Sequence, residues 1–563
     1  MKKYKWQLLI IFLCIGIVGF LFINRDKPKA ESQNPLNPGA KPATYTEGVV
    51  GTLSRLNPVL EYGNPVDRDI DRLVFSRLVT FDSMGQPTPE LANVWAISID
   101  GLTYTVQIKP DVKWHDGTDL TVKDVAFSVD LLKAGGEGVP ADLQRFWNEI
   151  EVTILNDTTI QFQLPEPYAP FIDYLSFGIV PEHILGGLSG EELRNSKFNI
   201  EPVGSGPFKF DSLISENQKI TGIVLVRNED YYNTPANLEK VTLLFFPDST
   251  AALEAYKTGK VQGISKVDAA ALPGALAEKR LNMYTSRLPR LSMVMFNLKA
   301  NNLAFLQDPK VRSALYGAIN KQYIVSNIWG GQVIPADGPI FPGTWAYMGN
   351  PYPVPYSPET SMTHLTEAGY KLSSDPATIR LDKNDVPMEF TLLFPDTATH
   401  KLVAEEIQRG WDALGIKIDI VGVTFDDLIN NRLKNRDFQA ALVDLDLSNY
   451  PDPDPYPFWD SVQATDGQNY SQWEQKVASE YLEEARVTVR LEERVKFYRN
   501  FQVIFAEELP ALPLYYPVTT YAVDDYIQGI RIGPLLNSSD RFGNITEWYT
   551  ADQTPQSTQT PTP

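Results

Sequence analysis

Alternating apolar and polar positions predict β-strands in two parts of this chain. In TYTVQIK, residues 103–109, the side chains of Tyr104, Val106 and Ile108 fall on one face. That period of two is typical of a strand with one buried face. Residues 416–420 alternate in the same way, with isoleucine at every second position, so we expect a strand there too.

Three other segments repeat apolar residues at the spacing of an α-helix. The first follows Thr121, which together with Asp124 has the pattern of a helix N-terminus. The second begins at Asp308 with a proline directly after it, a combination that caps and opens a helix. The third, residues 403–414, stops at Gly415 just before the second strand. Helix, glycine and strand in this order indicate a mixed α/β fold.

Length and composition are those of a folded, multidomain protein. The chain has 563 residues, of which 43% are apolar and 21% are charged. We therefore expect two or three domains rather than a single core. The net charge of −20 argues against nucleic acid as a partner, because such a surface would not neutralise phosphates.

The N-terminus predicts contact with a membrane. Three lysines in the first five residues precede an apolar run at about residues 8–23, near the shortest length that spans a bilayer. A cleaved signal peptide and a lipoprotein modified at Cys14 are the alternatives, but bulky apolar residues continue past Cys14. We predict an uncleaved anchor over residues 1–23, with the folded part outside the membrane, periplasmic or extracellular. A flexible tether is predicted over residues 24–44 and a disordered tail over residues 551–563.

Motifs of the common enzyme classes are missing from the sequence. It has no G-x-S-x-G nucleophile elbow and neither of the glycine-rich phosphate loops. Its four histidines stand singly, without the spacing of metal ligands, and its one cysteine lies in the N-terminal apolar run. His115 precedes Asp116, but neighbours on an extended chain point to opposite faces, so we expect a turn rather than a catalytic dyad. We predict no enzyme activity, no metal and no cofactor.

Residues 444–459, DLDLSNYPDPDPYPFW, concentrate aspartates among prolines and aromatic residues. A calcium loop starting at Asp452 would need a glycine and a carboxylate where Pro457 and Gln463 stand. A catalytic acid pair formed by Asp452 and Asp454 stays open on sequence grounds, although the flanking prolines favour a rigid turn. The segment fits the rim of a preformed pocket, with a solvated Asp-Pro turn as the alternative.

Several segments together resemble the extracellular solute-binding proteins of family 5, the oligopeptide-, dipeptide- and nickel-binding components of ABC importers. The likeness covers about residues 45–550, in the order typical of the family. It is strongest where an alternating strand is followed by a Trp-His-Asp-Gly turn and an Asp-Val helix. The segments that carry it are LANVWAISIDGLTYTVQIKPDVKWHDGTDLTVKDVAFSVDLL (91–132), GSGPFKF (204–210), NEDYY (228–232), PDSTAALEAYKTGKVQG (247–263), MFNLKANNLAFLQDPKVRSALYGAINKQYI (295–324) and LPALPLYYP (509–517).

The resemblance implies a periplasmic-binding-protein-like clamp of type II, an α/β fold whose two lobes close by hinge motion around a ligand. It places lobe I at residues 45–295, with an extra α/β domain at about 76–200, lobe II at 296–514, and a return to lobe I at 515–550. It also implies that the chain captures peptides outside the membrane, largely through backbone hydrogen bonds. The peptides would pass chemically intact to the permease subunits of an ABC importer.

The aspartate-rich segment departs from the family pattern at two positions. Asp446 stands where the family usually has tryptophan, and Asn449 stands where peptide binders have the aspartate that pairs with the ligand's amino group. Losing that charge-assisted bond would cost about 1.5–3 kcal/mol. Either Asp446 or Asp444 takes over the role, which we expect for a peptide ligand, or the ligand has no free amine at that point. The predicted ligand-binding residues are Asn449, Asp446, Asp444, Tyr450, Asp452, Trp459, Trp345 and Asn57.

Two other functions compete with peptide capture. The same fold could bind an oligosaccharide, a nickel chelate or another small solute, with Trp345 and Trp459 stacking on a sugar, whereas Trp411 lies on the apolar stripe of its helix. A membrane-tethered hydrolase or a sensor domain is the third possibility. The missing catalytic motifs argue against a hydrolase, and the lack of a cytoplasmic output domain argues against a sensor.

Overall fold

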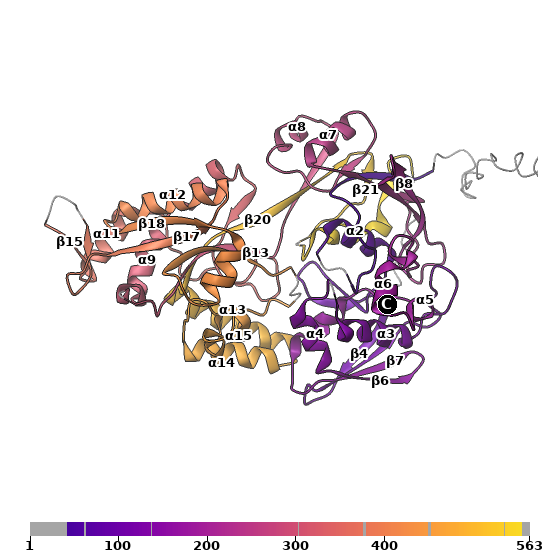
Figure 1. The fold of residues 1–563 in the computed structure, drawn as a ribbon, viewed down its shortest axis with the longest axis horizontal. Coiled ribbons are helices and arrows are strands. Elements are labelled where there is room, and N and C mark those ends of the chain that lie inside the picture. Colours follow the sequence, from indigo (N-terminus) through magenta and orange to yellow (C-terminus); the bar gives the residue numbers. More distant parts are fainter. Residues whose placement is uncertain are drawn as a thin grey trace, which may run out of the picture.

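The computed structural model describes residues 42–60, 63–136, 138–301, 303–374, 379–448, 452–533 and 535–553. Two lobes lie side by side, and the long strand β20 (Ala511–Asp524) crosses from one to the other (Figure 1). The predicted anchor over residues 1–23 lies outside the described residues, as do most of the predicted tether and tail.

One mixed sheet runs through both lobes, in the order β18-β17-β19-β13-β20-β11-β1-β10-β9-β8, and β12 and β14 also pair with β20. The first half of β20 pairs with lobe II strands and the second half with lobe I strands, so this strand joins the lobes. Most of β20 is buried, which explains its nearly continuous apolar sequence. The other strands are β1 (Thr44–Val50), β8 (Phe208–Glu216), β9 (Lys219–Arg227), β10 (Lys240–Phe246), β11 (Gly263–Ile264) and β12 (Leu281–Arg287) in lobe I, and β13 (Arg290–Phe296), β14 (Val333–Pro335), β17 (Glu389–Pro395), β18 (Lys417–Val423) and β19 (Ala440–Asp446) in lobe II.

Lobe I carries an inserted domain built on the antiparallel sheet β4-β5-β7-β6. The alternating segment forms β5 as predicted, and Thr121 and Asp124 make the predicted capping box at the start of α3. Helix α2 of lobe I begins at a proline, and Asn64 caps it by accepting a hydrogen bond from the Val66 N–H at 2.9 Å. Outside the large sheet, the helices and strands of lobe I and its inserted domain are α2 (Pro65–Val74), β2 (Val79–Phe81), β3 (Pro87–Pro89), β4 (Ala92–Ile97), β5 (Thr103–Ile108), α3 (Val122–Ala134), α4 (Ala141–Asn148), β6 (Glu151–Asn156), β7 (Thr159–Gln163), the 3-10 helix η1 (Ala169–Ser176), α5 (Glu182–Leu185), α6 (Gly190–Asn195), α7 (Ser249–Lys257) and α8 (Leu272–Leu276).

In lobe II, helices cover both faces of the sheet. Val294 and Phe296 of β13 point into one core, with α9 and α12, while Met293 and Met295 point into the other, with α14 and α15. This is the alternation of a strand buried on both sides. The helices are α9 (Pro309–Gly317), α10 (Lys321–Tyr323), α11 (Pro358–Glu367), α12 (Ala398–Asp412), α13 (Tyr456–Trp459), α14 (Lys476–Val487) and α15 (Leu491–Glu508).

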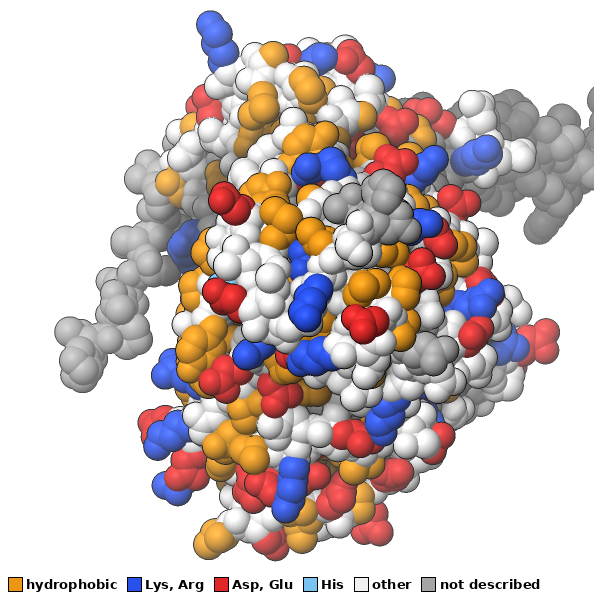
Figure 2. Space-filling model, turned by 90° about the vertical axis from the view of Figure 1, so that its left-hand side faces the viewer, with side chains coloured by type: hydrophobic (Ala, Val, Ile, Leu, Met, Phe, Trp, Pro, Cys, Tyr) orange, Lys and Arg blue, Asp and Glu red, His pale blue; other side chains and the backbone are white. Residues whose placement is uncertain are grey.

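The predicted elements of lobe II are confirmed. The side chain of Asp308 caps α9 by accepting from the Lys310 N–H, and a proline occupies the first turn. The chain leaves α12 through Gly415, whose φ of 77° suits glycine, and enters β18. In Figure 2, which views lobe II, acidic, basic and apolar side chains are interspersed over the face.

His115 ties a turn to a neighbouring loop. Its Nε2 donates to the Gly206 carbonyl at 3.0 Å, and its Nδ1 accepts from the Gly204 N–H at 3.2 Å. Burial lowers the pKa of His115 to about 4, so the imidazole stays neutral in this role. Asp116 pairs instead with His183 at 2.7 Å. The expected turn is therefore present, and His115 and Asp116 form no dyad.

Candidate functional site

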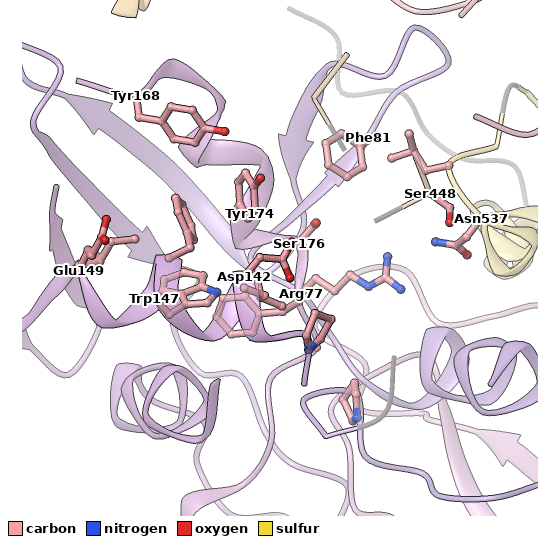
Figure 3. Close-up of a pocket in the computed structure, with 18 of the residues that line it drawn as sticks. Arg77, Phe81, Asp142, Trp147, Glu149, Tyr168, Tyr174, Ser176, Ser448 and Asn537 are labelled. Carbon is pink, nitrogen blue, oxygen red and sulfur yellow. The ribbon is translucent and has the colours of Figure 1, made fainter. Parts of the chain in front are cut away.

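A cavity of about 460 Å³ lies where lobe I, the inserted domain and lobe II meet (Figure 3). Lobe I contributes part of α2, and the inserted domain contributes Phe81 at the end of β2, together with α4 and η1. Lobe II contributes Ser448, two residues after β19, and Arg486 near the end of α14. A concave site of this size at a domain junction is typical of small-ligand binding.

Aromatic rings from the inserted domain form one wall of the cavity. The ring centres of Phe146 and Tyr174 are 4.4 Å apart, and those of Trp147 and Phe177 are 5.4 Å apart. Trp147 is 1% exposed and therefore fixed by its neighbours. Tyr168 is also in the wall, and its ring centre lies 5.8 Å from that of Phe146. This mutual packing gives the cavity a rigid, largely apolar surface before any ligand arrives.

Charges are distributed unevenly around the cavity. Arg68 of α2 and Arg77, which follows that helix, line it, and both are half-buried. Burial lowers the pKa of Arg77, and the neighbouring cation Arg72 lowers it further. Exposed carboxylates of the inserted domain line it on another side, at Asp142, Glu149 and Glu166. Asp71 and Asp540 also line the cavity near these arginines, so charges of both signs meet there, while the rim formed by the inserted domain is acidic.

Arg486 connects lobe II to the inserted domain. Its Nε donates to Asp454 at 2.9 Å, and its guanidinium lies 4.0 Å from the ring centre of Tyr456, all within lobe II. The same guanidinium lies 5.0 Å from the ring centre of Tyr168, across the boundary. A cation between two aromatic rings is a favourable contact that joins the two sides.

A buried group of charges forms a second contact across the boundary. Arg494 of α15 holds Asp452 with two hydrogen bonds, of 2.8 and 2.9 Å. Asp173 of η1 faces Asp452 from the inserted domain. Burial raises the pKa of Asp173 well above its ordinary value, and the charge of Asp452 raises it further. Two buried carboxyl groups lie together here because one of them can hold a proton.

The predicted residues Asp444 and Asp446 are engaged within lobe II. Asp444 accepts from the Ser292 hydroxyl and lies 2.9 Å from His400 Nε2. Asp446 forms an ion pair of 2.8 Å with Arg290. Neither aspartate lines the cavity. Asn449 and Tyr450 lie outside the described residues, but Ser448, directly before them, is part of the lining.

The remaining predicted residues lie behind the cavity surface. Asp452 is bound by Arg494, and Trp459 is 1% exposed and packs 4.8 Å from the ring of Phe505. Trp345 is buried, and the guanidinium of Arg494 lies 4.9 Å from its ring centre. Asn57 is fully buried, and its neighbour Pro58 lines the cavity. In this arrangement these side chains support the site, and their contact with a ligand stays a prediction.

The residues that line the cavity are not among those predicted from the sequence, although Pro58 and Ser448 are neighbours of the predicted Asn57 and Asn449. The aromatic wall had a usable signal, since residues 146–177 hold many aromatic residues over a short length. Arg68 and Arg77 had none, because single arginines in a helix and a following loop are ordinary surface residues. Only the tertiary fold brings them to the cavity.

Two features are absent from the part of the chain that the structure describes. In that part, His, Cys, Asp and Glu side chains form no group of three or more that could hold a metal ion. None of its helices combines the length and apolar character needed to cross a membrane. The predicted N-terminal anchor is not among the residues covered by this finding.

Comparison with known sequences gives a consistent result. The family model of the bacterial extracellular solute-binding proteins, family 5 Middle, matches residues 86–468. The oligopeptide-binding protein AppA of Bacillus subtilis is 28% identical, and the match covers 98% of this chain and all of that protein. The dipeptide-binding protein of Escherichia coli is 26% identical over 84% of this chain and 89% of that protein.

Solved structures have the same fold. AppA from Bacillus subtilis in complex with a nonapeptide is 26% identical, with a TM-score of 0.63, over 91% of this chain and 99% of that one. The unliganded open form of the periplasmic murein tripeptide binding protein MppA is 21% identical, with a TM-score of 0.74, over 91% of this chain and 98% of that one. The type II two-lobed fold expected from the sequence is confirmed.

Proposed function

The chain belongs to the bacterial extracellular solute-binding proteins of family 5, and we propose that it captures peptides outside the membrane and delivers them to the permease of an ABC importer. The observation that carries this proposal is the position of the cavity, which is lined by both lobes and the inserted domain. A ligand in such a cavity touches parts that can move relative to one another, so its binding energy favours closure.

The connections between the lobes are suited to a hinge. The pairing of β20 passes from lobe II to lobe I between Pro517, opposite Val333, and Val518, opposite Arg287. The second connection is the short turn between β12 and β13, where the Arg290 N–H donates to the Leu288 carbonyl at 2.7 Å. Rotations at these few residues would move whole lobes, because hinge closure needs only a few changing backbone angles. The higher TM-score with an open, unliganded relative supports an open starting state.

We propose that the cargo leaves chemically unchanged. Asp452 and Asp454, the acids considered for bond cleavage, are held by Arg494 and Arg486. The groups that line the cavity are aromatic rings, arginines and rim carboxylates, which hold a peptide through stacking and hydrogen bonds. Binding without catalysis agrees with this arrangement.

We also propose the boundaries and the membrane attachment. Lobe I comprises residues 45–295 and 515–550, with the inserted domain at about 76–200, and lobe II comprises 296–514. Residues 1–23 anchor the protein in the membrane, and residues 24–44 give the clamp the reach to meet its permease. Fractionation of cells into membrane and soluble parts, for the full chain and for a chain starting at residue 42, tests the anchor.

Mass spectrometry of material that co-purifies with residues 42–553 tests the cargo. We expect peptides, and we expect synthetic copies to bind in a titration that follows tryptophan fluorescence. Recovery of the same peptides, uncut, after prolonged incubation is the second expected result. Binding of an oligosaccharide or a nickel chelate with no peptide binding, or cleavage of the bound peptide, would contradict the proposal.

A further inference from the structure

The inserted domain and lobe II touch each other beside the cavity. The Trp345 N–H of lobe II donates to the carbonyl of Met84, in the turn between β2 and β3, at 2.9 Å. The Arg486 guanidinium lies 5.0 Å from the ring centre of Tyr168, and both residues line the cavity. A wider separation of the lobes, which admits a cargo, breaks such contacts, and closure restores them.

Three buried charged side chains lie at the same boundary. Asp173 of η1 is 1% exposed, and Asp452 and Arg494 of lobe II are each 5% exposed. The side chains of Asp173 and Asp452 are hydrogen-bonded to each other across the boundary. Two ionised carboxylates are acceptors only, so this hydrogen bond requires a proton on one of them. That proton also removes the one negative charge that a single arginine leaves uncompensated in a buried site.

The proton belongs on Asp173. Asp452 accepts two hydrogen bonds from Arg494, of 2.8 and 2.9 Å, and its Oδ1 also faces the Tyr498 hydroxyl at 3.4 Å. These donors favour the ionised form of Asp452. The Oδ1 of Asp173 has no hydrogen-bond partner among the described residues. Burial, and next the charge of Asp452, raise the pKa of Asp173 well above its ordinary value.

Other titratable groups around the pair have partners of their own. From the inserted domain, the Tyr104 hydroxyl faces Asp173 and donates to the Tyr168 carbonyl at 3.0 Å. From lobe II, Asp454 is held by Arg486 at 2.9 Å. None of these groups compensates the charge that Asp173 acquires when it ionises.

We propose that the contact between Asp173 and Asp452 is a proton-dependent latch: closure of the lobes around a cargo takes up one proton, and loss of that proton favours opening and release. This inference rests on the proposed function and adds a regulation to it. With the lobes apart, the two carboxyl groups are hydrated and ionise separately. With the lobes closed, Asp173 holds the shared proton.

The sign of the pH effect follows from these two states. Below the ordinary pKa of 3.8, Asp173 is protonated in both states, and closure takes up no proton. Above it, the closed state holds a proton that the open state has lost, so the affinity for cargo falls by up to about tenfold for each pH unit. The fall ends at the raised pKa, above which both states are ionised.

Calorimetric titration of the full chain with one co-purified peptide tests the latch. Affinity is measured from about pH 5 to about pH 8, in buffers of different ionisation enthalpy, which gives the number of protons taken up. Asp173→Asn stays neutral and can still donate to Asp452. The control is Asp130→Asn, because Asp130 is exposed on α3 and does not line the cavity. If thermal unfolding shows that Asp173→Asn is not folded, Asp173→Ser, which is also a neutral donor, takes its place.

We expect the wild type and Asp130→Asn to lose affinity about tenfold or more across this range relative to Asp173→Asn, and to take up as many as one more proton per bound peptide. Titrating groups of the peptide and of the cavity rim are common to all three proteins, so they cancel in the comparison. Parallel pH profiles with equal proton counts would overturn the latch but not peptide capture. The same holds for an Asp173→Asn variant that binds more weakly by one constant factor at every pH. A wild type that binds no peptide at any pH would overturn the proposed function and this inference together.

Discussion

The guanidinium of Arg486 lies 5.0 Å from the ring centre of Tyr168, and the two residues belong to opposite sides of the cavity. Arg486 is on α14 of lobe II, and Tyr168 directly precedes η1 of the inserted domain. This contact joins the two sides of the site, and both of its residues also line the cavity. Changes at this pair should alter how the lobes meet as well as how a ligand fits.

A double-mutant cycle measures this contact. We expect Arg486→Met and Tyr168→Leu to show a coupling of about 0.5–2 kcal/mol in urea unfolding, because each removes the same cation–π interaction. Tyr168→Phe is the matched control, since it keeps the ring and should keep most of the coupling. Additive effects of Arg486→Met and Tyr168→Leu would show that the pair contributes nothing across the boundary.

The carboxyl group of Asp173 gives the boundary a pH dependence. Its pKa in the folded protein is raised above the ordinary value of 3.8, first by burial and then by Asp452. The folded state therefore holds a proton that the unfolded state has lost, and the free energy of unfolding falls as pH rises from about 4 toward the raised pKa. The charged groups that face Asp173 are Asp452 and Arg494, and Asp173 also acts on the nearby hydroxyl group of Tyr104.

Urea unfolding at a series of pH values tests this sign. We expect Asp173→Asn to remove the part of the pH dependence that is due to Asp173, because the amide can still donate to Asp452 but does not ionise. The variant should match the wild type near pH 4 and exceed it at higher pH. A wild type whose stability rises across this range, relative to the variant, would contradict the assignment.

The aromatic wall should contribute to cargo affinity. We expect Phe146→Ala to weaken peptide binding roughly three- to tenfold, because it removes a contact surface and loosens Tyr174, whose ring centre is 4.4 Å away. Val462→Ala, at a position 69% exposed on lobe II, is the control and should bind as the wild type does. If calorimetric titration shows that Phe146→Ala binds peptide as tightly as the wild type, the aromatic wall does not contribute to binding.

Local sequence patterns were sufficient to predict several helices and strands. Together with the family resemblance, they were also sufficient to predict the two-lobed clamp. Thr121 and Asp124 predict the start of α3, and Asp308 with its following proline predicts the start of α9, because helix caps depend on residues that are neighbours in sequence. The cavity depends on tertiary contacts. Asp444 and Asp446 lie in a segment whose composition is typical of a ligand site. In the fold, however, Asp444 contacts His400 and Asp446 pairs with Arg290, and neither partner is near in sequence. Arg77 became part of the candidate site only when the fold placed it at the cavity.

Small-angle X-ray scattering with and without a saturating co-purified peptide tests the central claim, that two lobes close around an intact cargo. We predict a smaller radius of gyration in the presence of the peptide and a return to the original value after its removal. Identical scattering profiles in both states, for a peptide that calorimetry shows to be bound, would contradict closure of the lobes around the cargo.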